Sequence, residues 1–122
     1  MREGLLAGAA VFAAAPALAA PDFAGRYAQP AKFYSETAVI SRLPDGDYSV
    51  TIDLDFRGCR GRVEARGRVE GNSLIATAQK DGKESCRLEI KQEPPGIHVF
   101  EENCARNRDA GCEFSSFLRK RP

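Results

Sequence analysis

Tyr48-Ser-Val-Thr-Ile-Asp-Leu-Asp-Phe56 is the stretch that decides the fold, because apolar and polar residues alternate along its whole length. Successive side chains of a β-strand point to opposite faces, so this period of two gathers the large apolar residues on one face. One apolar face and one charged face are typical of an antiparallel sheet with one side in water. The stretch therefore predicts a half-buried strand over 48–56.

The segments on either side repeat this pattern and are separated by short turn signals rich in Gly, Asn and Pro. No segment of helix length shows a helical period. The expected strands are 23–28, 34–42, 48–56, 62–70, 73–79, 85–91, 97–102 and 113–120. The last of these lacks a clean period of two, which favours a β-bulge there. The sequence predicts an all-β fold, an antiparallel meander of about eight strands closed into a small barrel, with a β-sandwich as the alternative.

The N-terminal residues form a separate unit with the features of an export signal. A short n-region, Met1-Arg2, precedes an apolar run from Leu5 to Ala15, and Ala17-Leu18-Ala19 fits a signal-peptidase site. The run is shorter than the ~20 residues that span a bilayer, so we expect no integral membrane anchor. We therefore expect a cleaved signal peptide over 1–19, a single domain over 20–122, and a periplasmic or secreted protein.

Four cysteines lie in the expected domain. Exported proteins reach an oxidising compartment, where an even number of cysteines indicates a disulfide framework. The meander brings all four to one end of the barrel: Cys59, Cys86, Cys104 and Cys112. Four cysteines permit three pairings. We favour the pairs nearest in sequence, Cys59 with Cys86 and Cys104 with Cys112. A zinc site is disfavoured because no pair has C-x-x-C spacing.

The composition argues against several classes of function. The net charge of +1 gives no global attraction to nucleic acid. The single histidine, His98, has no activated nucleophile in a recognisable motif beside it. Asp53 and Asp55 share the outward face of one strand instead of facing each other across a cleft. We therefore expect a protein that is not an enzyme and holds no metal or cofactor.

Two basic segments are the candidates for binding. The segment between the last two cysteines carries a set of polar residues that a disulfide would hold rigid, which favours recognition of a partner: Arg106, Asn107, Arg108 and Asp109. Its alternative role is to cap the barrel end. The second candidate is an arginine cluster, which forms either a patch for anionic ligands or a charged edge that prevents aggregation: Arg57, Arg60, Arg62, Arg66 and Arg68.

Several short motifs are similar to those of known exported proteins. They are Phe23-x-Gly25-x-Tyr27, Asp47-Tyr48, Gly71-Asn72-Ser73-Leu74, Cys86-Arg87-Leu88 and Cys104…Gly111-Cys112-Glu113-Phe114-Ser115-x-Phe117-x-Arg119. Together they resemble small, mostly uncharacterised periplasmic β-barrel proteins of proteobacteria, which are distantly similar to periplasmic lysozyme inhibitors. The C-type inhibitors carry a Ser-Gly-rich motif and a Tyr-x-Cys motif. Neither motif occurs here, so no inhibitory residue is carried over.

The resemblance and the residues lead to one leading function and two alternatives. The leading expectation is a binding or inhibitor module whose partner is a lysozyme-type glycosidase or another envelope protein, because Arg106 and Arg108 suit an acidic cleft. The first alternative is a lipocalin-like carrier of small molecules, which needs a hollow barrel lined by small residues: Ala65, Gly67, Ala76 and Ala78. The second alternative is a structural envelope protein without a soluble ligand.

Overall fold

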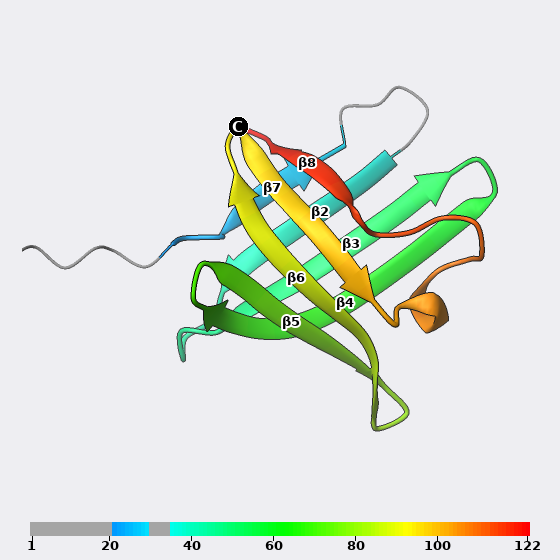
Figure 1. Ribbon diagram of the computed structural model, residues 1–122, viewed down its shortest axis with the longest axis horizontal. Helices are drawn as coiled ribbons and strands as arrows, with labels where there is room; N and C mark the ends of the chain where they lie inside the picture. Colours follow the sequence, from blue (N-terminus) through cyan, green and yellow to red (C-terminus); the bar gives the residue numbers. More distant parts are fainter. Residues whose placement is uncertain (1–20, 30–34) are drawn as a thin grey trace, which may run out of the picture.

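The computed structural model of the chain describes residues 21–29 and 35–122. In this part eight antiparallel strands follow one another around a closed barrel, which confirms the predicted fold class (Figure 1). The strands are β1 (Gly25–Ala28), β2 (Ser35–Arg42), β3 (Tyr48–Phe56), β4 (Cys59–Glu70), β5 (Ser73–Lys80), β6 (Lys83–Glu93), β7 (Gly96–Glu102) and β8 (Ser116–Lys120). The expected signal peptide over 1–19 lies outside the described residues. No described helix is long and apolar enough to cross a membrane.

The alternating residues of β3 point inward as the sequence predicts, and side chains of this kind occupy the barrel interior. Tyr48, Val50, Ile52 and Leu54 are all buried. The largest fully buried hydrophobic side chains come from β2, β3 and β5 to β8 and from the segments just before β1 and β8, and they include Phe23, Ile40, Tyr48, Ile52, Leu74, Leu88, Ile90, Ile97, Phe114 and Leu118. An eight-stranded barrel is just wide enough for such side chains to fill it.

The ladder between β4 and β5 is incomplete, which gives the barrel its most distinctive feature. Pairing runs from Glu70–Ser73 to Arg66–Thr77 and stops there, so that β4 and β5 diverge beyond this point. Figure 1 shows the short 3₁₀ helix η1 (Ala105–Asn107) in the opening between the two strands. Beyond the end of the pairing, the Asn107 amide donates to the Arg62 carbonyl oxygen at 3.4 Å.

Two disulfides form, as predicted, but the pairing we favoured is wrong. The bonds join Cys59 with Cys112 and Cys86 with Cys104. The physical reason is strand order. β6 pairs with β7 through Arg87 and Glu102, so the residues just beyond that pair, Cys86 and Cys104, come together. Strand β5 lies between β4 and β6, and it keeps Cys59 away from Cys86. Two disulfides fit an oxidising compartment.

The end of the chain also departs from the expected strand boundaries. β8 begins at Ser116, three residues later than expected, and the preceding segment buries Phe114 in the core. β8 pairs with β7 without the bulge expected there, whereas a register shift occurs between β5 and β6 at Ala78/Gln79.

Candidate functional site

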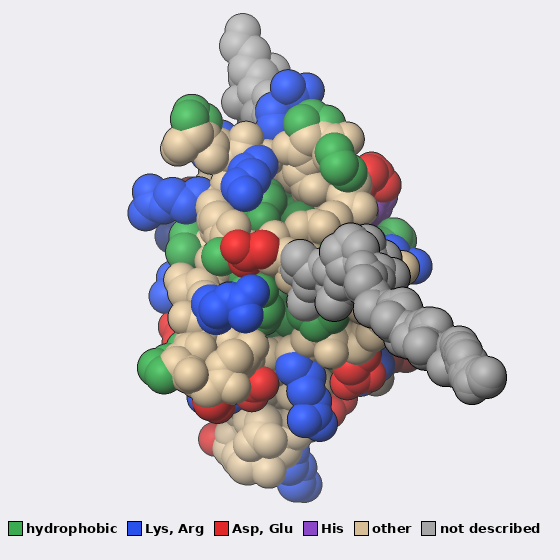
Figure 2. Space-filling view, turned by 90° about the vertical axis from the view of Figure 1, so that its left-hand side faces the viewer, with side chains coloured by type: hydrophobic (Ala, Val, Ile, Leu, Met, Phe, Trp, Pro, Cys, Tyr) green, Lys and Arg blue, Asp and Glu red, His purple; other side chains and the backbone are tan. Residues whose placement is uncertain are grey.

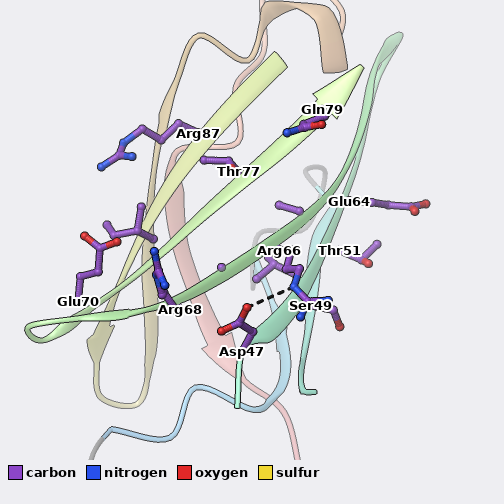
Figure 3. A pocket seen from close by; sticks show the side chains of 14 residues that line it. Asp47, Ser49, Thr51, Glu64, Arg66, Arg68, Glu70, Thr77, Gln79 and Arg87 are labelled. Atoms are coloured by element: carbon purple, nitrogen blue, oxygen red, sulfur yellow. Dashed lines mark hydrogen bonds and ion pairs between the residues drawn. The ribbon is translucent and has the colours of Figure 1, made fainter. Parts of the chain in front are cut away.

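A concave region on the outer surface, beside the point where β4 and β5 diverge, is the candidate site (Figure 3). We call it the fork groove. Its volume is about 720 Å³. It is lined by residues of β3, β4, β5 and β6 and of the turn before β3: Asp47, Ser49, Val50, Thr51, Glu64, Ala65, Arg66, Gly67, Arg68, Glu70, Ile75, Thr77, Gln79 and Arg87. Most of these side chains are the polar members of the alternating strands, which therefore point away from the core.

Gly67 allows β4 and β5 to approach each other closely beneath the groove. A Cβ atom at this position would collide with the Ile75 carbonyl oxygen and lie 2.6 Å from the Ala76 Cα. Only a residue without a side chain allows the two strands to approach this closely, just before they separate. Gly67 therefore shapes the groove through space and not through an unusual backbone angle.

Arg66 and Arg62 of the predicted cluster each pair with two carboxylates. Arg66 pairs with Asp45 and with Asp47, and the latter pair is 3.2 Å long. Arg62 reaches Asp53 on β3 at 2.7 Å and Glu64 at 3.0 Å. Hydrogen bonds to these two carboxylates raise the pKa of the Arg62 guanidinium. These arginines are fixed in place, and their charges are compensated.

Besides Arg66, two arginines line the groove, Arg68 and Arg87, and their ionic contacts are weaker. Within 21–29 and 35–122, Arg68 makes no ion pair, and the contact between Arg87 Nε and Glu102 is 3.7 Å long. Glu70 likewise has no ion pair in this part of the chain. Figure 3 shows the Arg66–Asp47 pair at one end of the groove and Arg68 and Arg87 along another side. The groove therefore offers two cationic side chains that a ligand can engage.

The four residues predicted to bind a partner lie close together, but most of them serve the fold. Arg108 binds Glu101 through Nε and Nη2, at 3.0 and 2.7 Å. A carboxylate oxygen of Asp109 accepts the Arg60 backbone N–H at 2.9 Å, and Asn107 contacts β4 as described above. Arg106 and Asp109 are both exposed, and of the four only Arg106 has a side chain that makes no hydrogen bond or ion pair within the described residues. The segment thus fills the opening between β4 and β5, in agreement with the alternative role of a cap.

The sequence did not reveal one internal charged group, Glu36. This side chain is fully buried, and its Oε1 atom accepts a hydrogen bond from the Ser116 hydroxyl at 2.7 Å. The alternation of β2 does indicate that Glu36 points inward, because it shares the inward face of the strand with Ala38 and Ile40. Alternation fixes the direction of such a side chain but does not supply its partner, which comes from the opposite end of the chain.

The remaining surface carries charges of both signs. On the face shown in Figure 2, basic and acidic side chains are interspersed. His98 stacks on Phe100, with ring centroids 4.5 Å apart, and its Nδ1 lies 3.5 Å from Glu93. In the described part of the chain, no three His, Cys, Asp or Glu side chains are grouped so as to hold a metal ion.

Comparison with protein-family models, curated proteins and solved structures gives no match.

Proposed function

We propose that this protein is an exported binding module of the inhibitor type, periplasmic or secreted, which holds a carboxylate-bearing segment of a partner protein in the fork groove. One observation carries the proposal. Arg68 lines a concave surface without an ion pair among the described residues, and Arg87 on the same surface makes only a 3.7 Å contact with Glu102, beside an Arg66 that is already compensated. The guanidinium group matches the geometry of a carboxylate and binds it through two parallel hydrogen bonds.

The packed interior favours this reading over a carrier. The residues expected to line a hollow barrel, Ala65, Ala76 and Ala78, are buried against the larger core side chains. No aromatic ring lines the groove, so stacking on sugars or bases has no platform there. Side chains from four strands converge on the groove instead, and their donors and acceptors suit a polar polypeptide segment.

A lysozyme-type glycosidase remains the leading partner class, with an acidic segment of its surface held in the fork groove. The arginines that we propose to contact the partner differ from the pair expected from the sequence, Arg106 and Arg108. Arg108 is occupied by Glu101, whereas Arg68 and Arg87 are available together on one surface. We therefore assign recognition to the groove and not to the segment between Cys104 and Cys112.

Binding of a defined acidic peptide tests the proposal. A labelled short peptide of alternating Glu and Ser is titrated with the protein, and fluorescence anisotropy reports the affinity. We expect Arg68→Ala and Arg87→Ala each to weaken binding about tenfold, the effect of losing about 1.4 kcal/mol from a charged hydrogen-bonded pair. Arg119→Ala is the matched control, since this exposed arginine of β8 lies outside the groove. A peptide with Gln in place of Glu should bind much more weakly.

Two results would overturn the assignment to the groove. The first is an affinity for the acidic peptide that is the same in Arg68→Ala, Arg87→Ala and Arg119→Ala. The second comes from inhibition assays with lysozymes of several classes. Inhibition that is lost in Arg106→Ala but kept in Arg68→Ala would place recognition on the segment between Cys104 and Cys112.

A further inference from the structure

Ser85 is the extra residue of the bulge between β5 and β6. The register passes from Ala78–Cys86 to Gln79–Glu84, so Ser85 has no partner opposite it on β5. Ser85 and Cys86 are consecutive yet both buried, with 2% and 1% of their surface exposed. In a regular strand one of them would face water, because successive side chains point to opposite faces. The bulge thus turns the serine away from solvent, which is a common use of bulges near functional sites.

The buried hydroxyl of Ser85 lacks a hydrogen-bond partner among the described residues. Leaving a buried polar group unsatisfied costs about 1–3 kcal/mol, so native proteins keep few of them. Alanine at this position would avoid the cost. The serine is therefore best explained by a bound group that the hydroxyl contacts.

Ser85 lines a small pocket with cationic walls, which we call the Ser85 pocket. Its volume is about 380 Å³, and its other lining residues are Lys83, Glu84, Asn103, Ala105 and Arg106. Neither Lys83 nor Arg106 makes an ion pair within the described part of the chain. A third cation, Lys80, lies at the same place, since its Nζ donates to the Arg106 carbonyl oxygen at 3.3 Å. Cationic residues from two separate segments therefore line the pocket that contains the serine.

The two walls of the Ser85 pocket are fixed relative to each other. One wall belongs to β6 and the other to the segment after β7, and the disulfide between Cys86 and Cys104 joins them. A preformed arrangement loses little conformational entropy when a ligand binds. The volume exceeds the about 30 Å³ that one water molecule occupies in the liquid, so there is room for an ion with its waters.

We propose that the Ser85 pocket binds a small tetrahedral oxyanion, free phosphate or sulfate or the phosphoryl group of a larger molecule. Lys83 and Arg106 supply the charge, and Ser85 donates a hydrogen bond to one anion oxygen. Glu84 opposes binding through its own negative charge and restricts it to ligands that the cations hold firmly. This site is separate from the fork groove and does not depend on the function proposed for the groove.

Titration with inorganic phosphate tests the proposal on the full domain. Changes in amide chemical shifts locate the bound ion. Unfolding equilibria measured with and without phosphate show how much binding stabilises the folded protein. At ten times the dissociation constant, phosphate should raise the folding equilibrium constant of the native protein about elevenfold. The same addition should have little effect on Ser85→Ala and Arg106→Ala, whereas Glu84→Gln should bind phosphate more tightly. Lys91→Ala, an exposed lysine of β6 outside the pocket, is the matched control.

Chloride at equal ionic strength separates specific binding from general salt effects, which act on all variants alike. Tighter binding of glycerol phosphate than of free phosphate would identify a phosphoryl group as the natural ligand. Equal stabilisation of the native protein and Ser85→Ala by phosphate would overturn the proposal. So would the absence of shift changes at 83–86 and 103–106, since the hydroxyl would then contact only water.

Discussion

The guanidinium of Arg108 and the carboxylate of Glu101 form a forked ion pair, with Nη2 2.7 Å from Oε2 and Nε 3.0 Å from Oε1. Only 19% of the arginine side chain and 8% of the glutamate side chain are exposed. The same carboxylate also accepts the backbone N–H of Phe114, whose ring lies in the core. This cluster ties the segment between the last two cysteines to the end of β7 and to the interior.

Replacement of Arg108 by alanine should therefore destabilise the fold. The change leaves a mostly buried carboxylate without its cation, which costs on the order of 3 kcal/mol. Arg106→Ala, two positions away and exposed, should change the free energy of unfolding by less than about 0.5 kcal/mol. Urea denaturation measures both values. Similar losses in the two variants would show that the forked pair contributes little to stability.

The bond between Cys59 and Cys112 should hold the same segment against β4. The double variant Cys59→Ala/Cys112→Ala should lose roughly 2–4 kcal/mol, because the unfolded chain gains freedom. Limited proteolysis should then cut between 105 and 111, and the native protein should resist under the same conditions. Peptide mapping of the native protein should recover Cys59 linked to Cys112. A peptide that links Cys59 to Cys86 would contradict this connectivity.

The close approach of β4 and β5 at Gly67 predicts a strong effect of a single methyl group. Gly67→Ala places a Cβ against the backbone of β5, and overpacking of this kind costs about 1–3 kcal/mol. We also expect weaker binding of acidic peptides, since β4 and β5 must move apart beneath the groove. Gly71→Asn is the control. Its backbone has a φ of 64°, which asparagine tolerates, and a Cβ there meets no other atom within 4 Å. Thermal unfolding of both variants checks the difference.

Tyr27 should make the fold sensitive to alkali. Its hydroxyl donates to the Phe23 carbonyl oxygen at 2.8 Å, and burial raises its pKa above the usual 10.0. Above pH 10 the unfolded chain therefore releases this proton more readily than the folded protein, and stability falls as the pH rises. Urea denaturation between about pH 8 and pH 11 should show a steeper loss in the native protein than in Tyr27→Phe. Equal slopes would mean that Tyr27 titrates alike in both states.

The sequence predicted the barrel because its signal is local. Alternation from Tyr48 to Leu54 fixes which side chains point inward, and turn residues such as Gly71 and Asn72 fix where strands reverse. The number and order of strands follow from these two features. Closure into a barrel, and not into the sandwich that was the alternative, rests on the pairing of β1 with β8, which no local pattern shows.

The disulfide pairing and the site were harder to predict because they depend on distant segments. Sequence distance favours Cys59 with Cys86, but strand adjacency decides the pairing, and it places Cys104 beside Cys86. No sequence signal near Arg108 indicates that its partner is Glu101, which lies seven positions earlier on a different element. The groove arises where β4 and β5 diverge; Gly67 within β4 indicates a close approach of the two strands, but nothing in either strand indicates that their pairing ends at Arg66 and Thr77.

Chemical-shift mapping with the acidic Glu-Ser peptide tests the central claim most directly, namely that a filled barrel recognises its partner on its outer surface. We predict that the shifted amides cluster on the fork groove, around Ser49, Thr51, Arg68, Thr77 and Arg87. Core amides such as those of Ile52 and Leu88 should keep their positions. Shifts concentrated on inward-facing residues, or on 105–109 with the groove unchanged, would contradict the account.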